Sequence, residues 1–369
     1  MQRRGVDLAS LDGVTSAREP LLVSAVRRLP PGYFALVMAT GIISLGLELE
    51  GFHASSDLLL AIAMGAYAVL LVLTVWRAIQ FPRDVVADFS GPRNGFSFFT
   101  FVAGTNVLGA RLAAAGVPVV PYVLLVLSFL AWLVLGYVIP GLVVSKNQGD
   151  DILAGLNGTW LIWSVASQSV AVLAASLEPS AGEFGNGLSI MAVLSWGIGV
   201  ILYAVIGCAL IIRVLTRGIP VEQMGPPYWV TMGAGAITVL AGSRIVEMSD
   251  TAMVSVMRAP VAAAAVVFWA FATWLIPALI GIGIWRHLIH KVPLRYEAAM
   301  WSMVFPLGMY AVAGIYLGRA DDLPIVGWIG GRFLWVALVV WAIILVAMLV
   351  SLFRAARRRD NVGAVHPTP

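Results

Sequence analysis

Ten long apolar runs are the feature that most constrains how this chain can fold. Each run has about the 20 residues that a helix needs to cross the hydrocarbon core of a bilayer. Lipid offers no partner to an open strand edge, so such runs cross a membrane as helices. The sequence therefore predicts an all-α integral membrane protein with ten spans, at about 31–49, 57–78, 95–115, 119–144, 157–177, 187–214, 227–248, 260–285, 297–317 and 332–353.

The composition agrees with this class. Of the 369 residues, 60% are hydrophobic and 11% are charged, whereas a soluble domain carries roughly 25% charged residues. The single cysteine, Cys208, cannot form a disulfide within the chain or a thiolate metal site. Residues 1–28 lack the apolar core of a cleavable signal peptide. We expect no metal, no cofactor and no nucleic-acid partner.

The placement of Lys and Arg predicts the orientation. Most of the 23 basic residues fall in the N-terminal segment, in the loops after the even spans, and in "RAARRR" near the C-terminus. Basic loops stay in the cytoplasm, and an even number of spans returns both termini to one side. We predict a multi-pass protein of the inner cell membrane, with a cytoplasmic tail over 1–29, a ten-helix domain over 30–354 and a basic cytoplasmic tail over 355–369.

The odd spans begin at similar intervals, near 31, 95, 157, 227 and 297. Each odd span and the even span after it would form a helical hairpin. Five such hairpins suggest a ring with one helix of each pair inside and the other outside. Any ten-span protein with short loops would show similar spacing, so the intervals alone do not establish the ring.

Small and polar side chains follow single faces of the odd spans, whereas the tenth span, "FLWVALVVWAIILVAML", is bulky and apolar. Two interpretations are open. Such residues let membrane helices pack closely, or they line a polar path. Their concentration on the odd spans, with both mid-span amides, favours the path. The predicted lining residues are Thr40, Gly41, Ser44, Thr105, Asn106, Ser164, Gln168, Thr231, Gly235, Thr238 and Gly308.

Charged residues inside the spans are few. Arg111 and Arg244 lie toward the outer ends of the third and seventh spans. An ionisable residue in a span is a functional candidate, so both are candidate anion contacts at an outer mouth, although side chains this close to the interface can also reach water. No acid or histidine lies at mid-membrane, which leaves a proton relay without an obvious carrier.

Three stretches resemble one family. They are "PPGYFALVMATGIISLG" in the first span, "NGTWLIWSVASQSVAVLAASL" in the fifth and "MWSMVFPLGMYAVAG" in the ninth. In this order and spacing they resemble the tellurite-resistance/dicarboxylate transporter family, which includes bacterial TehA, fungal malate permeases and sulfite exporters, and plant slow anion channels. The resemblance covers all ten spans and does not single out a subfamily.

The resemblance implies a fold and a site. The fold would be five helical hairpins in a pseudo-fivefold ring around a central pore, assembled as a homotrimer in the lipid bilayer. A phenylalanine of the ninth span closes the pore in such proteins, and "VFP" matches it to Phe305. Pro306 cannot donate to the carbonyl of Ser302, so it would bend the helix beside this gate.

The leading functional prediction is therefore transport of small anions, monovalent ions or C4-dicarboxylates such as malate, through a pore occluded by Phe305. The alternatives within transport are a proton-coupled malate symporter and an exporter of tellurite or sulfite oxyanions. An enzyme is disfavoured because the four histidines and Cys208 form no nucleophile–base pair. A receptor or scaffold without transport is a third class.

Overall fold

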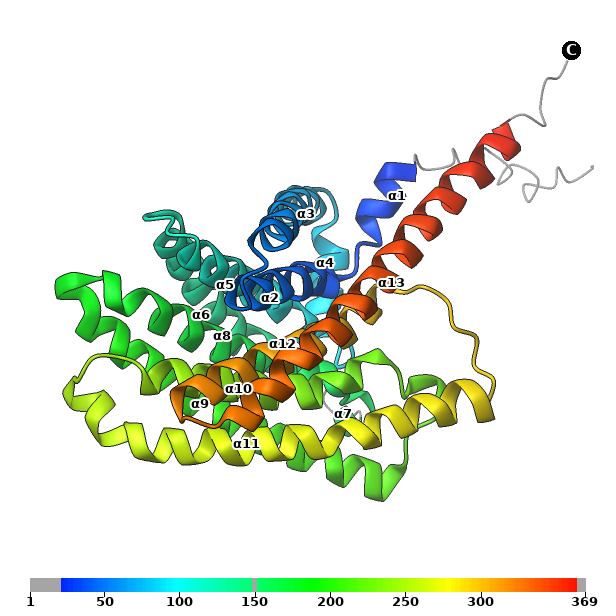
Figure 1. The fold of residues 1–369 in the computed structure, drawn as a ribbon. Helices are drawn as coiled ribbons and strands as arrows, with labels where there is room; N and C mark the ends of the chain where they lie inside the picture. Colours follow the sequence, from blue (N-terminus) through cyan, green and yellow to red (C-terminus); the bar gives the residue numbers. More distant parts are fainter. Residues whose placement is uncertain (1–20, 148–150, 364–369) are drawn as a thin grey trace, which may run out of the picture.

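The computed structural model describes residues 21–147 and 151–363 of the chain (Figure 1). In these residues every regular element is helical, and ten helices are long and apolar enough to cross a membrane. This confirms the ten predicted spans. The eighth and tenth begin at Ala252 and Pro324, about two helical turns earlier than predicted. Thr251 caps the eighth span by accepting from the Val254 amide, and Pro324 suits a first helical turn.

Five spans form the inside of the bundle. In the most apolar stretch of each of these, between 78% and 83% of residues are buried. They are the odd spans, in which small and polar residues were noted. Their α-helices are α2 (Ala35–Leu49), α5 (Phe99–Ala114), α8 (Leu161–Leu177), α10 (Val230–Val246) and α12 (Trp301–Ala320).

The five even spans surround them. Only 17% to 28% of the corresponding stretches are buried, and apolar side chains such as Val69, Leu130 and Val339 are exposed, as contact with lipid requires. The outer helices are α3 (His53–Gln80), α6 (Val120–Lys146), α9 (Gly185–Arg217), α11 (Ala252–Ile284) and α13 (Pro324–Gly363). α13 projects beyond the bundle toward the C-terminus (Figure 1).

The inner helices contact one another in a closed cycle. α2 packs against α5, α5 against α8, α8 against α10, α10 against α12, and α12 against α2. Each inner helix also packs against the outer helix that follows it in the chain. Buried and exposed spans therefore alternate along the chain because each of the five helix pairs contributes one helix to this closed cycle and one to its outside.

A short 3₁₀ turn precedes every inner helix, and these turns contact one another in the same cyclic order. They are η2 (Pro31–Phe34), η3 (Gly95–Phe98), η4 (Gly158–Trp160), η8 (Pro226–Trp229) and η10 (Ala298–Met300). The remaining short elements lie in the connections: α1 (Leu21–Arg27), α4 (Pro82–Ser90), α7 (Ile152–Gly155), η5 (Glu178–Ser180), η6 (Gly182–Phe184), η7 (Val221–Gln223) and the π-helical turn η9 (Trp285–Ile289).

The predicted tails are described only in part. Of the segment 1–29, residues 1–20 lie outside the described residues, and α1 occupies most of the rest. At the other end, α13 continues as a helix through the start of the predicted tail to Gly363, and 364–369 lie outside the described residues.

Arg111 ties three helices together at the end of the bundle opposite the 3₁₀ turns. Its side chain is 1% exposed. Its Nη2 donates to Glu48 of α2 at 2.9 Å and to Asp57 of α3 at 3.0 Å. Its Nε donates to the hydroxyls of Ser44 at 3.0 Å and Ser56 at 3.1 Å. These contacts assign to Arg111 a role in joining α2, α3 and α5.

We therefore expect Arg111→Leu to lower the stability of the protein. The substitution leaves Glu48, Ser44 and Ser56 without their shared donor. The loss should be on the order of 2 kcal/mol, less than for a fully buried pair because Asp57 is exposed. The measurement is the melting temperature of the purified protein in detergent. Arg332→Leu is the control, since Arg332 is exposed and its guanidinium lies over the ring of Trp328; equal melting temperatures would contradict the proposed role.

Candidate functional site

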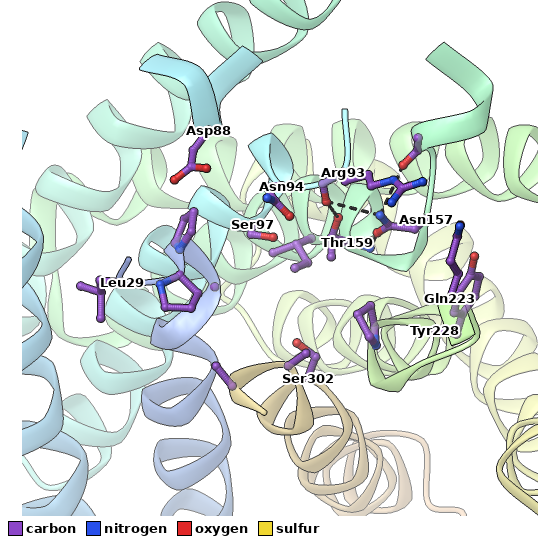
Figure 2. A pocket seen from close by; sticks show the side chains of 18 of the residues that line it. Leu29, Asp88, Arg93, Asn94, Ser97, Asn157, Thr159, Gln223, Tyr228 and Ser302 are labelled. Atoms are coloured by element: carbon purple, nitrogen blue, oxygen red, sulfur yellow. Dashed lines mark hydrogen bonds between the residues drawn. The ribbon is translucent and has the colours of Figure 1, made fainter. Parts of the chain in front are cut away.

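A large cavity opens at the end of the bundle where the inner helices begin. Its volume is about 510 Å³. Every one of the five inner spans contributes to its wall, through Pro31, Ser97, Thr159, Tyr228 and Ser302. Figure 2 shows Ser97, Thr159, Tyr228 and Ser302 around this space. The cavity therefore lies where the cycle of helices closes, and we call it the inner cavity.

The inner cavity is basic. Four arginines line it, with one carboxylate, that of Asp88. Arg77 donates to Asp88 at 2.6 Å, so this pair is internally neutral. The three remaining guanidiniums give the cavity a positive potential, which raises the local concentration of anions. They belong to Arg28, Arg93 and Arg213.

Polar groups of the wall are organised around these arginines. The backbone carbonyl of Arg93 accepts from Asn157 Nδ2 at 3.3 Å and from the Thr159 hydroxyl at 3.2 Å (Figure 2). Arg213 donates to the amide oxygen of Gln223 at 3.2 Å. The buried hydroxyl of Tyr228 faces Arg213, which can only donate, so its own O–H has no acceptor among the described residues. It is a donor that a bound anion or water can engage.

Two further cavities follow along the same helices. A small axial cavity of about 10 Å³ has room for about one water molecule. It adjoins an outer cavity of about 280 Å³. All five inner helices line both, and the two share Leu45, Ala110, Val172 and Leu240.

Two helices show that the three cavities are in line. Along α12, Ser302 lines the inner, Met309 the axial and Tyr316 the outer cavity. Along α8, Ile162, Ser169 and Ser176 do the same. Residues seven apart occupy one face of a helix and are separated by about 10 Å along it. The cavities are thus stacked along one axis.

The axial cavity is almost wholly apolar. Its two polar side chains satisfy each other, because Asn106 Nδ2 donates to the Ser169 hydroxyl at 2.9 Å. The Asn106 oxygen accepts from Ser128 of α6 at 2.6 Å. The rest of the wall consists of Ile42, Leu45, Val107, Ala110, Val172, Ile237, Leu240 and Met309.

Arg244, one of the two arginines predicted as anion contacts, lines the outer cavity. Its Nη1 donates to Glu247 at 2.7 Å, and its guanidinium lies 5.2 Å from the ring centre of Tyr316. Its Nε is buried and has no hydrogen-bond partner among the described residues. Arg111, the other predicted contact, lies in the network of α2, α3 and α5 and is not part of the outer cavity wall.

Phe305 lies along α12 between Ser302, which lines the inner cavity, and Met309, which lines the axial cavity, and is itself part of neither wall. It is three residues after Ser302 and four before Met309, which is the same face of α12. Its side chain is 1% exposed. The next residue, Pro306, lies inside α12, which continues through it as helix. A Cβ at Gly233 of α10 would lie 2.7 Å from Pro306 Cγ, so the glycine permits this close approach.

Of the predicted lining residues, Asn106 lies in the axial cavity. The other polar ones on α5 and α8 bond to outer helices. Thr105 shares a hydrogen bond of 3.0 Å with Tyr67 of α3. Ser164 donates to the Gly199 carbonyl of α9 at 2.7 Å, and Gln168 Nε2 to that of Trp196 at 3.2 Å. These contacts favour the packing interpretation for the three residues.

The predicted residues on α2 show the same pattern. Thr40 accepts from Trp341 Nε1 of α13 at 3.0 Å, and Ser44 donates to the Ser56 carbonyl of α3 at 2.7 Å. Gly41 faces Val107 of α5, where a Cβ would lie 3.0 Å from a methyl group.

On α10 and α12 the predicted residues also meet neighbouring helices or their own backbone. The hydroxyls of Thr231 and Thr238 donate to the carbonyls of Tyr228 and Ala234. Gly235 faces Ala272 of α11, and Gly308 faces Ile42 and Ile43 of α2. The walls of the three cavities contain none of these residues from α2, α10 and α12.

The apolar wall of the axial cavity and the basic wall of the inner cavity do not follow from the sequence. Ile42, Ile237 and Met309 carry no polar signal, and apolar residues are expected everywhere in a span. Helical periodicity relates Phe305 or Asn106 only to residues of the same helix, so it does not identify wall residues on the other helices. In the sequence, Arg28 and Arg93 indicate only which side of the membrane their segments lie on.

The described residues contain no group of three or more His, Cys, Asp or Glu placed to hold a metal ion. His287 Nδ1 contacts the Val292 carbonyl at 2.8 Å, and His290 packs on Trp285. Outside the spans, burial raises the pKa of Tyr296, as does the neighbouring hydroxyl of Tyr33, and burial raises the pKa of Asp321.

Ten membrane-spanning helices with cavities stacked between the buried ones are typical of a membrane transport protein. The model of the family described as "Voltage-dependent anion channel" matches residues 28–349. The chain therefore belongs to the voltage-dependent anion channel (SLAC1) family, whose members move anions across membranes and are channels or transporters, not enzymes.

Two kinds of relatives are similar to the chain. The uncharacterized membrane proteins Rv1735c and MT1776 of two Mycobacterium tuberculosis strains are each 51% identical to it over 171 residues, which is 45% of this chain and 87% of theirs. The uncharacterized transporter MJ0762 of Methanocaldococcus jannaschii is 21% identical over 355 residues, covering 92% of this chain and 99% of its own.

The placement of the polar side chains can be checked by thiol labelling. In a Cys208→Ser background, Ser302→Cys and Ser176→Cys should react with a water-soluble maleimide, because these positions line cavities. Thr40→Cys and Ser164→Cys should be protected, because they face outer helices. Mass spectrometry of the labelled protein gives the extent of reaction. Fast labelling at Thr40 and Ser164 would instead favour a pore-lining role for them.

Proposed function

We propose that the protein conducts small anions along the axis of the three cavities. The five helix pairs would form a pseudo-fivefold ring around a central pore, which the closed cycle of inner helices and the matching cycle of 3₁₀ turns support. The observation that carries the proposal is the stacking of three cavities, each lined by all five inner helices.

Phe305 is proposed as the gate. Support comes from its position on α12, between Ser302 of the wide inner cavity and Met309 of the axial space of about 10 Å³. A buried benzyl group at such a narrowing excludes water, and a hydrophobic constriction of this kind blocks ions. Pro306 removes one backbone hydrogen bond beside it, and Gly233 leaves no side chain between Pro306 and α10.

The charges at the two mouths favour anions. The inner cavity holds three arginines beyond its ion pair, and Arg244 lines the outer cavity. The walls of the axial and outer cavities contain no carboxylate among the described residues. Because no cationic cluster lies at mid-membrane to hold a dicarboxylate firmly, weak binding and rapid passage fit a channel better than a coupled carrier.

The conducted ions would be monovalent anions, C4-dicarboxylates such as malate, or both. We place the protein in the inner cell membrane with both termini, and hence the inner cavity, on the cytoplasmic side. The exposed apolar outer helices contact lipid and, in the assembly that the family resemblance implies, two further copies in a homotrimer with one pore per subunit.

Phe305→Ala should raise anion conductance strongly. Removing the ring joins the inner and axial cavities. The measurement is current across bilayers containing the purified protein, in chloride, nitrate, sulfite and malate. Leu307→Ala is the control, because Leu307 is also buried on α12 but lies two residues on, near the opposite face.

Equal and negligible currents for the wild type, Phe305→Ala and Leu307→Ala would contradict the proposal that Phe305 is the gate.

The same recordings separate a channel from a proton-coupled symporter and from an oxyanion exporter. Current that follows voltage and ignores a pH gradient supports a channel. Malate accumulation driven by a pH gradient supports the proton-coupled symporter, and selectivity for sulfite over chloride and malate supports an oxyanion exporter.

The double variant Arg28→Gln/Arg93→Gln should lower anion conductance at low ionic strength. It removes two of the cationic groups that concentrate anions in the inner cavity. The reduction should be several-fold at about 10 mM salt and should shrink near 1 M, where charges are screened within about 3 Å. The control is Arg83→Gln, because Arg83 is an exposed residue of α4 that lies outside that cavity. A reduction that is independent of salt would contradict the electrostatic role.

A further inference from the structure

A second large hollow lies on the outside of the bundle, away from the axis. It has a volume of about 600 Å³ and runs between α11 and α13, the outer helices on either side of α12. The connection from α11 to α12 closes one end, near the right-hand end of α11 in Figure 1. We call this hollow the lateral groove.

The walls of the lateral groove are apolar over most of their length. α11 contributes Ile280 and Ile284, and α13 contributes Ile343. These side chains are 48%, 50% and 60% exposed, so the protein leaves them to be covered from outside. An apolar groove between two lipid-facing helices fits a hydrocarbon chain.

One end of the groove is cationic. Arg286, His287 and Arg295 line it, and Glu297 is the one carboxylate in the wall. The Arg286 Nε is buried and has no hydrogen-bond partner among the described residues. A buried guanidinium N–H without a partner is costly, so this atom marks a place where a ligand oxygen fits.

The local backbone brings these groups to the groove. α11 ends in the π-helical turn η9, which contains Arg286 and His287, and π-helical turns are frequent at functional sites. Lys291 follows with a left-handed φ of 54°, after which the chain turns to place Arg295 and Tyr296 on the groove wall. Trp229, also in the wall, and Tyr296 are residues typical of the interface between lipid and water.

We propose that the lateral groove is a binding site for an anionic phospholipid. One acyl chain would occupy the space between α11 and α13, and the phosphate would be held by Arg286 and Arg295. The charge of the groove wall identifies the class of lipid. Two guanidiniums against one carboxylate favour an anionic over a zwitterionic headgroup, as basic pockets between membrane helices do. This inference is independent of the conducted ion.

The test is native mass spectrometry of the full-length protein with phosphatidylglycerol or phosphatidylcholine of the same acyl chains. The wild type should prefer phosphatidylglycerol on the order of tenfold, because the two guanidiniums favour its net negative headgroup. Arg286→Gln/Arg295→Gln should abolish the preference, and Arg83→Gln on α4 should retain it. Equal binding of the two lipids by the wild type would overturn the proposal.

A steric variant locates the acyl chain. Gly283 lines the groove, and a Cβ there would meet nothing within 4 Å, so Gly283→Trp fills the groove without a clash at its base. It should lower phosphatidylglycerol binding. Gly281→Trp is the matched control, because Gly281 is equally open but is not part of the groove wall. If Gly283→Trp leaves lipid binding intact and instead changes the oligomeric state, the groove is a contact between subunits and the proposal is wrong.

Discussion

The absence of hydrogen-bond partners in lipid is the constraint on which this structure depends. A hydroxyl or amide buried in a span must find its partner within the protein. On three inner helices the polar side chains find their partners on outer helices: Thr105 bonds to α3, Gln168 to α9 and Thr40 to α13. The same bonds join α2, α5 and α8 to outer helices, so these polar side chains hold inner and outer helices together.

This arrangement explains why the axis is narrowest where it is least polar. With most polar side chains bonded to neighbouring helices, the axial wall is left to groups such as Ile42, Ile237 and Met309. An ion there has little to replace its water shell except the Asn106–Ser169 pair. In the proposed function, discrimination by charge therefore belongs to the two wider cavities, and the narrow apolar middle is the barrier that Phe305 is proposed to control.

The sequence predicted the elements of the fold well and the site only in part. Span number and the inner or outer position of each span follow from hydropathy and from the contrast between small-residue and bulky spans. Helical periodicity shows that Ser164 and Gln168 share a face, but not which neighbour that face meets. A hydroxyl that lines water and one that bonds to a carbonyl of the next helix have the same sequence pattern, so the lining residues required the structure.

The two outer arginines show what distinguishes a structural charge from one available to an ion. Arg111 is 1% exposed and bonded to two carboxylates and two hydroxyls from α2 and α3, which neutralise its charge. Its Nη1 is buried without a partner among the described residues, but Arg111 lines none of the three cavities. Arg244 has one carboxylate partner, is 21% exposed, lines the outer cavity and keeps a buried Nε without a partner. Both arginines have an N–H without a partner, so access to the outer cavity is what distinguishes Arg244 as the proposed anion contact.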